Sequence, residues 1–350
     1  MVNKVKIQIY CSFLLLFFCS SHLFAIGMET AIKKAREAES EGVIVCSPDG
    51  KNGELPALAV AKLKEGMELR LMPGRYPAEI IIDCNKVIIS SEGTEPCYVD
   101  LRVRSRSVIV RGINIIGDLS IYRDSIIIDS LINYLKLVGF SKEKTDLFVY
   151  NTGFNYVRSY SSNPINLTMK NCTVKSYFYL RASTRVSIED SILYSPSILF
   201  RVYDYSNKKG RLFLKNNLLY AGSLLANDET SSSSKKTKLS AALLKDLKKV
   251  WGAVLVGDNM VAKPAFMEKS YFLTDESIGH GKGLIPDEHP KYKKPKVAEK
   301  EVSVRKPVPV TAKKVSPPKV RPRIPTPHKK LTPPPSKPLG GGLGGIPTPP

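Results

Sequence analysis

Tyrosine and arginine alternate with apolar residues in three segments near the middle of this 350-residue chain. If Val157, Phe178 and Phe200 point into a core, alternation along extended strands directs their polar neighbours to the outer face. Arginine pairs in a planar fork with carboxylates or sulfates, and tyrosine offers a flat apolar ring with a hydroxyl group. Such a face would suit an acidic glycan. The candidate ligand-binding residues are Tyr156, Arg158, Tyr160, Tyr177, Tyr179, Arg181, Arg201 and Tyr203.

The same residues admit two other interpretations. Exposed strands are rich in Tyr, Arg and Thr for reasons of packing alone. A lyase is the second alternative, in which Tyr177 would act as the base and Arg158 or Arg181 would stabilise an enolate. Tyr122 and Lys136, which come from earlier segments, would extend this outer face under any of these interpretations.

The segments lie within a repeat of about twenty residues, and a repeat of this size indicates a solenoid whose units must stack to bury a core. Each unit has two or three apolar residues, a polar residue, and then Asn, Asp, Gly or Ser. Its copies are SVIVRG at Ser107, SIIIDS at Ser125, DLFVYN at Asp146, NLTMKN at Asn166, RVSIED at Arg185 and RLFLKN at Arg211.

Alternation within the repeats predicts rows of inward side chains. The expected inward pairs are Val108 and Val110, Ile126 and Ile128, Leu147 and Val149, Leu167 and Met169, Val186 and Ile188, and Leu212 and Leu214. The residue that follows must turn the chain sharply, so it should adopt left-handed backbone angles, which Gly, Asn and Asp tolerate best. These expected turn residues are Gly112, Asn151, Asn171, Asp190 and Asn216, and we assign them no chemistry.

The region before the repeats consists of a short amphipathic helix, the strand VIVC, a second short helix and a strand that ends in a turn. The residues that carry this pattern are Gly66, Leu69, Leu71, Pro73, Gly74 and Tyr76. This order resembles the entry to right-handed parallel β-helix proteins of the pectin-lyase-like superfamily, with its "PGxY" turn, although Met67 stands where an acid commonly follows the glycine. A "P-x-F" step at Pro264 and a closing "S-x-x-G-x-G" at Ser277 continue the resemblance.

Known enzymes of that superfamily act on acidic polysaccharides through clustered aspartates, or through Ca²⁺ with an arginine. A hydrolase site would need Asn-Thr-Asp and Asp-Asp on successive coils, and the sequence contains neither. Outward positions carry Tyr and Arg rather than the carboxylates that Ca²⁺ needs. His280 in the closing coil is interpreted as a turn residue. We therefore predict no catalytic residue, no metal site and no cofactor.

The first residues have the layout of a secretory signal peptide. Lys4 and Lys6 precede an apolar run over residues 7–18, and cleavage would follow Ala25. A lipoprotein signal at Cys19 is the weaker alternative, because bulky residues precede that cysteine. We expect an exported protein, in the periplasm, at the cell surface or outside the cell, with no transmembrane span after maturation.

Four cysteines remain after the leader: Cys46, Cys84, Cys97 and Cys172. Export permits disulfides, and Cys84 and Cys97 could lie on adjacent coils, but buried free thiols are an equal alternative. No CxxC or Cys/His spacing indicates a metal.

The expected organisation has four parts. Residues 1–25 form the signal peptide, residues 26–66 the N-terminal helices and cap, and residues 67–285 an all-β parallel β-helix. A polar loop and an amphipathic helix interrupt the β-helix at residues 227–252. Residues 286–350 form a disordered tail that holds seventeen of the 25 prolines and fifteen Lys or Arg against four acids. The tail thus supplies +11 of the net charge of +21.

From these features we expect a monomer that binds an acidic polysaccharide or an anionic envelope polymer without catalysis. The alternatives are a polysaccharide lyase or glycoside hydrolase with an atypical site, and a structural envelope protein anchored by its cationic tail. A specific nucleic-acid partner is excluded by the expected export and by the lack of aromatic residues among the cations of the tail.

Overall fold

The structure, a computed structural model, describes residues 27–139, 143–161, 163–181, 183–203, 212–225, 236–237, 254–267, 270–274, 277–279 and 281–291. The predicted amphipathic helix at 239–251 and His280 lie outside these ranges, as do the predicted signal peptide and residues 292–350. No helix among the described residues is long and apolar enough to cross a membrane.

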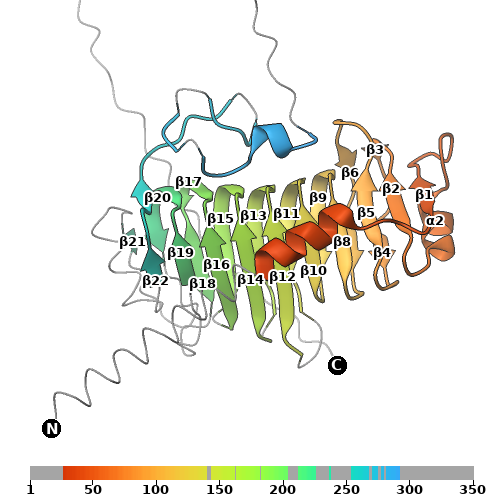
Figure 1. The fold of residues 1–350 in the computed structure, drawn as a ribbon, viewed down its shortest axis with the longest axis horizontal. Coiled ribbons are helices and arrows are strands. Elements are labelled where there is room, and N and C mark those ends of the chain that lie inside the picture. Colours follow the sequence, from red (N-terminus) through yellow and green to blue (C-terminus); the bar gives the residue numbers. More distant parts are fainter. Residues whose placement is uncertain are drawn as a thin grey trace, which may run out of the picture. The chain divides into compact units, whose positions relative to one another are not determined.

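The repeats form a parallel β-helix, as predicted, because each repeat contributes one strand that pairs in parallel with its equivalent in the next coil (Figure 1). The first sheet has ten strands in chain order. They are β1 (Val43–Cys46), β2 (Glu68–Leu71), β5 (Ile88–Ser91), β8 (Val108–Arg111), β10 (Ser125–Ile128), β12 (Thr145–Tyr150), β14 (Ile165–Lys170), β16 (Thr184–Glu189), β19 (Leu212–Lys215) and β22 (Val254–Val256).

The second sheet has thirteen strands and bends at irregularities that divide the longer strands into two halves. Its strands are β3 (Gly74–Arg75), β4 (Ile80–Ile82), β6 (Cys97–Tyr98), β7 (Leu101–Val103), β9 (Asn114–Ile121), β11 (Leu131–Leu137), β13 (Gly153–Ser159), β15 (Thr173–Arg181), β17 (Ile192–Ile198), β18 (Phe200–Tyr203), β20 (Leu218–Leu225), β21 (Lys236–Thr237) and β23 (Met260–Val261). Strand β21 pairs antiparallel with β20, while the remaining described pairs are parallel.

The core is a set of apolar rows inside the coils. Parallel pairing aligns equivalent residues of successive repeats, so each inward position stacks on itself. One such row consists of Val110, Ile127, Val149, Met169, Ile188 and Leu214, which are all fully buried.

The inward assignment of Ile126 and Ile128 was wrong. Strand β10 pairs Ser125 with Val108 and Ile127 with Val110, so Ser125 and Ile127 point inward. A shift of one residue exchanges the two faces of a strand, and three consecutive isoleucines satisfy an apolar requirement in either register. Ile126 and Ile128 instead contact the N-terminal helix on the outside.

The predicted turn residues have the backbone angles that a sharp turn needs. The φ values are 54° at Gly112, 46° at Asn151, 52° at Asn171, 47° at Asp190 and 53° at Asn216. In the SIIIDS repeat the turn residue is Asp129, with φ of 50°, rather than the serine after it. This offset of one residue explains the wrong register of that repeat.

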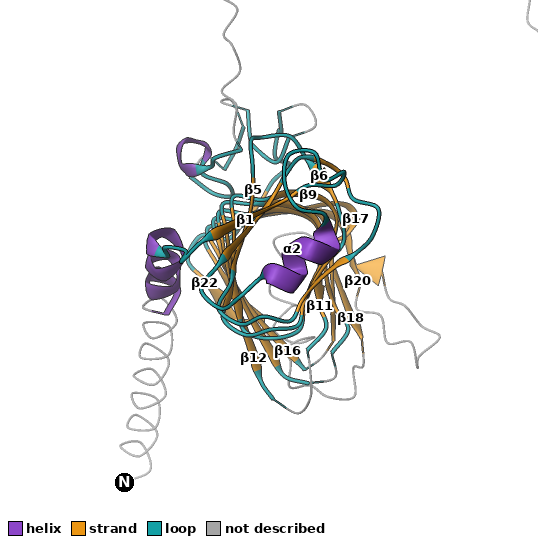
Figure 2. Cartoon of the chain, turned by 90° about the vertical axis from the view of Figure 1, so that its right-hand side faces the viewer, coloured by secondary structure: helices purple, strands orange, loops and turns teal. Residues whose placement is uncertain are grey.

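Two helices pack against the β-helix at different places. Helix α2 (Pro56–Lys62) lies across the end of the β-helix and buries Ala59 (Figure 2). The helical residues 27–37 lie on the outer face of the first sheet, where Met28 and Ala35 contact Ile88, Ile109 and Tyr150 (Figure 1). Arg111 fixes the end of this helix by donating to the carbonyl oxygen of Ala38 at 2.8 Å.

The disordered tail was predicted to begin at residue 286, but residues 286–291 are packed against the β-helix. They include the short 3₁₀ helix η1 (Pro286–Glu288) and the buried residues His289 and Lys291. Composition indicated disorder, whereas the polar groups of these residues find partners on the coils.

The four cysteines that the structure describes are free thiols. Cys46, Cys97 and Cys172 are buried and Cys84 is half-buried, so of the two alternatives the structure has free thiols rather than a disulfide between Cys84 and Cys97.

Candidate functional site

The predicted Tyr and Arg residues lie on the outer face of the second halves of β13, β15 and β18. Val157, Phe178, Leu180 and Phe200 are buried in the core, so alternation turns their neighbours outward. We call this surface the Tyr/Arg face. Its described side chains are Tyr134, Lys136, Tyr156, Arg158, Tyr160, Tyr177, Tyr179, Arg181 and Arg201.

Strand register brings the tyrosines together in a row. Tyr134 pairs with Tyr156, and Tyr156 pairs with Tyr177, on three successive coils. The first two rings stack with centroids 4.6 Å apart, and the next two meet edge to face at 4.8 Å. Each such contact adds about 0.5–1.5 kcal/mol beyond the burial of area, so the row forms a rigid apolar platform.

A second row alternates cations and rings. Lys136, Arg158, Tyr179 and Arg201 are paired in order across β11, β13, β15 and β18. Because successive strands lie about 4.8 Å apart, the two arginines are about 10 Å apart along the stack. The row therefore runs along the axis of the β-helix.

Both arginines of this row stack on tyrosine rings. The guanidinium carbon of Arg158 lies 4.4 Å from the ring centroids of both Tyr160 and Tyr179. The guanidinium of Arg201 lies 4.9 Å from the ring centroid of Tyr177. A guanidinium is weakly hydrated and planar, so it packs flat on a ring while its N–H groups remain in its plane.

These arginines have no acidic partner among the described residues. The ion pairs of the described chain do not include Arg158, Arg181 or Arg201. The Nε atoms of Arg158 and Arg201 are buried and lack a hydrogen-bond partner in the described structure. An unpaired buried donor is costly, so these two atoms mark a place where an acceptor would be favourable.

Lys136 differs from the arginines because it forms an ion pair with Asp118. This carboxylate neutralises the N-terminal end of the row. The net positive charge of the Tyr/Arg face therefore lies over β13, β15 and β18.

The other residues predicted for this face lie at its edges or are described only in part. Arg181 is half-buried at the end of β15, and its backbone pairs with that of Tyr203, whose side chain is not described. Tyr122 follows directly after β9. Tyr160 is the most exposed member of the face, at 38%.

Sequence reasoning missed two tyrosines, Tyr134 within the face and Tyr271 beside it. Tyr134 lies two residues before Lys136, and alternation alone would have placed both on the outer side. Tyr271 comes from the C-terminal segment and packs on Gly153, where a Cβ atom would lie 2.7 Å from its ring. Burial raises the pKa of Tyr271, and the nearby Tyr156 raises it further. No sequence pattern indicated this contact between residues more than a hundred positions apart.

Over β13, β15 and β18 the polar groups of the face are phenol hydroxyls and guanidinium cations. Burial and the hydroxyl group of Tyr177 raise the pKa of Tyr134, so this phenol stays protonated at neutral pH. No group of three or more His, Cys, Asp or Glu residues suited to a metal ion occurs in the described ranges. What the face offers is cations held on flat rings.

Comparisons with known protein families, with curated proteins and with solved structures found no match to this chain. The fold and the face together define a class, a parallel β-solenoid with a basic aromatic outer surface.

Proposed function

We propose that this protein binds an acidic polysaccharide through the Tyr/Arg face, without catalysis. The observation that carries the proposal is the pair of arginines, Arg158 and Arg201, stacked on tyrosines with no acid opposite them in the described chain. In-plane N–H groups of a guanidinium match the two oxygens of a carboxylate or sulfate.

The arrangement suits a polymer better than a small anion. Two cations about 10 Å apart in one row would contact two acidic groups of the same chain. The tyrosine row beside them adds ring edges and hydroxyl groups for contact with a sugar, because the faces of Tyr134 and Tyr156 are stacked on each other. The face also lies on strands, whose rigid positions reduce the entropy lost on binding.

Two features favour binding over catalysis. The hydroxyl of Tyr177, the base that a lyase would need, is hydrogen-bonded to the hydroxyl of Tyr134 at 3.4 Å, and burial raises the pKa of Tyr134, so this neighbour cannot accept its proton at neutral pH. The carboxylate of Asp118, which is on the adjacent coil, forms an ion pair with Lys136 and is therefore also a weak base.

The proposal also includes export of the protein and its membership of the pectin-lyase-like superfamily. The leader supports delivery to the envelope or beyond. Membership of the pectin-lyase-like superfamily is supported by the "PGxY" turn, in which the hydroxyl of Tyr76 donates to the carbonyl oxygens of Cys46 and Met72, both at 2.8 Å. This bond ties the first coil to the cap and gives the motif a structural reason.

The test is binding of pectate, alginate and chondroitin sulfate, with neutral dextran as the uncharged comparison. We expect the three acidic polymers to bind, with affinity that falls as salt rises, and dextran not to bind. R158Q and R201Q should each lower the affinity at least fivefold, since a hydrogen bond to a charged group contributes about 1.5–3 kcal/mol.

R185Q is the matched control. Arg185 is exposed on β16 of the other sheet, so this variant removes the same charge from a different face. If R185Q lowers the affinity as much as R158Q, binding depends on net charge and the proposed face is wrong. Release of unsaturated or reducing ends from any polymer would instead identify an enzyme.

A further inference from the structure

Residues 281–291, which we call the strap, run back along the turns of the β-helix, from the late coils towards the early ones. Gly283 N–H donates to the carbonyl oxygen of Asp190 at 2.8 Å, and Ile285 N–H donates to Oδ1 of Asn151 at 2.7 Å. At the far end Lys291 Nζ donates to the carbonyl oxygen of Ser91 at 3.1 Å. The strap thus fastens the last coils to the early ones.

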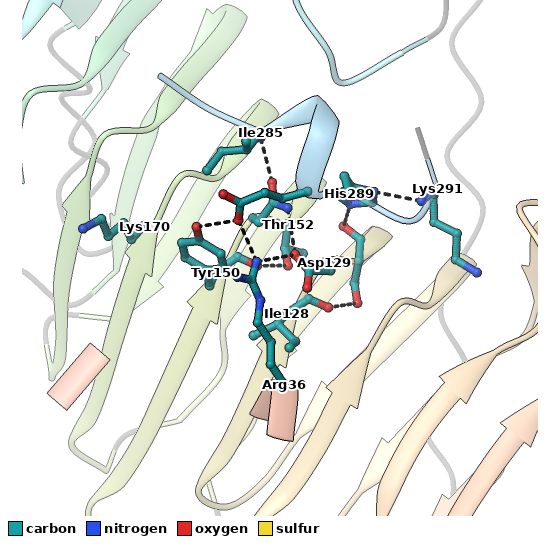
Figure 3. Close-up of polar contacts among 12 residues, drawn as sticks. Arg36, Ile128, Asp129, Tyr150, Thr152, Lys170, Ile285, His289 and Lys291 are labelled. Carbon is teal, nitrogen blue, oxygen red and sulfur yellow. Dashed lines mark hydrogen bonds and ion pairs between the residues drawn. The ribbon is translucent and has the colours of Figure 1, made fainter. Parts of the chain in front are cut away.

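The middle of the strap is held by charge. Glu288 accepts from Arg36 Nη2 at 2.7 Å and from the hydroxyl of Tyr150 at 3.2 Å (Figure 3). Arg36 also lies 3.7 Å from Asp129, which accepts a bond from Asn151 at 2.7 Å. The N-terminal helix, the turns and the strap therefore meet at one network.

His289 is buried within the strap, with 4% of its surface exposed. Its Nδ1 accepts the N–H of Lys291 at 3.2 Å, and its Nε2 lies 3.4 Å from the carbonyl oxygen of Ser130. A carbonyl only accepts, so Nε2 carries the proton and Nδ1 carries the lone pair. Both ring nitrogens are thus used by the neutral imidazole, and a second proton would break the bond to Lys291.

The charges around His289 oppose that second proton. Within the strap its neighbours are Lys291, a cation, and Glu288, whose carboxylate is engaged by Arg36. On the coil below, Asp129 is engaged by Asn151 and Arg36, and the ring packed against His289 from the C-terminal segment is the uncharged Phe272. Lys291 itself is bound to carbonyl oxygens of Ser91 and Gly93 rather than to an acid.

We propose that the strap is an acid-sensitive latch: protonation of His289 at Nδ1 breaks its bond with the N–H of Lys291, places a cation beside Lys291 and releases residues 281–291 from the turns. The latch does not depend on the proposed ligand. It would act on a protein that moves between neutral and acidic surroundings.

The shift in the pKa of His289 makes the docked strap less stable in acid, as the latch requires. Burial, with a contribution from Lys291, lowers the pKa of His289 from 6.5 to about 4. The released histidine takes up a proton below 6.5 while the docked one does not, so docking is strongest above that pH. It then weakens by up to about tenfold per pH unit as the pH falls towards 4.

The carboxyl groups of Glu288 and Asp129 do not weaken docking in the pH range where His289 does. Arg36 lowers the pKa of Glu288 below its ordinary 4.5, so the contribution of Glu288 is lost only in stronger acid. Burial raises the pKa of Asp129 from 3.8, which favours docking as that carboxyl protonates. Between pH 6.5 and 4.5 the histidine is therefore the group that loosens the strap.

Release would reach the edge of the Tyr/Arg face. Phe272 packs edge to face on His289 with centroids 5.4 Å apart, and its neighbour Tyr271 packs on Gly153 beside Tyr156. Only this consequence rests on the proposed ligand-binding function.

The test is hydrogen exchange of residues 281–291 in the full chain between pH 7 and pH 4, corrected for the intrinsic effect of pH. In the wild type we expect at least a tenfold loss of protection over this range. H289Q, whose amide supplies a donor and an acceptor without titrating, should keep its protection. E288Q is the matched control and should still release.

Equal loss of protection in H289Q and the wild type would overturn the proposal, as would full protection of the wild type at pH 4. If H289Q does not dock its strap at pH 7, a magnetic resonance titration of the wild-type histidines decides the matter. A His289 ring that titrates near 6.5 with the strap still docked overturns the latch, and one that stays neutral until release supports it. Polysaccharide binding at pH 7 is a separate measurement, so failure of either proposal is recognised independently.

Discussion

The guanidinium carbon of Arg158 lies 4.4 Å from the ring centroid of Tyr179, the residue that pairs with it across β13 and β15. The register of two strands thus fixes a cation on a ring, and Tyr160 covers it at the same distance. A cation held in this way has already lost much of its side-chain freedom, so less entropy is lost when it binds an anion.

This contact predicts the effect of two substitutions at Tyr179. Y179L removes the ring and should lower the affinity for pectate about threefold to thirtyfold, since cation–π contacts contribute about 0.5–2 kcal/mol. Y179F keeps the ring and should stay close to the wild type. Y98L is the control, because Tyr98 also contacts an arginine, Arg75 at 5.7 Å, on a different strand. A loss with Y98L as large as with Y179L would contradict the prediction.

Arg111 is predicted to dock the N-terminal helix. It bonds the carbonyl oxygens of Ala35 and Ala38 and pairs with the buried Glu68 at 3.2 Å. R111A should lower the free energy of unfolding by about 1.5–3 kcal/mol and expose the helix to hydrogen exchange. R70A is the control. Arg70 bonds the same carboxylate of Glu68 but is more exposed than Arg111, and its bonds do not involve the helix, so the helix should stay protected in R70A. Protection that is unchanged in R111A would exclude this role.

Two turn asparagines should differ in their contribution to stability. Both have positive φ, so alanine introduces similar backbone strain at Asn151 and Asn171. The buried Asn151 side chain also bonds Asp129 and the strap, whereas that of Asn171 bonds no described residue through its amide. N151A should therefore cost about 1–3 kcal/mol more than N171A in chemical denaturation. Equal costs would mean that the backbone angle alone matters.

The buried cysteines should resist alkylation in the native protein. Burial raises the pKa of Cys46 and Cys97 to about 11 and that of Cys172 to about 12, so the reactive thiolate is scarce at neutral pH. Cys84 is half-buried and should react first. Among Cys46, Cys84, Cys97 and Cys172, peptide mapping after iodoacetamide treatment should find label at Cys84 alone in the native protein, and at all four residues in urea. Label on native Cys172 at the rate of Cys84 would refute this.

Much of the fold was predictable, because a parallel β-helix repeats the same local requirements in every coil. Asn151 and Asn171 could be assigned as turn residues since few other residues tolerate that backbone angle. The SIIIDS repeat was the exception. Its isoleucine run fits both faces, and only the position of the N-terminal helix over Ile126 and Ile128 explains why both faces are apolar.

The sequence by itself determined the β-helix, its turn residues and the outward direction of Arg158, Tyr179 and Arg201, because strand alternation and left-handed turns are local properties. Only the tertiary structure decided which rings those arginines stack on, since register between coils sets the distances. It likewise decided that Tyr271 borders the face and that His289 is buried within the strap. These contacts join residues far apart in sequence, and no local pattern specifies which coil a returning segment will cross.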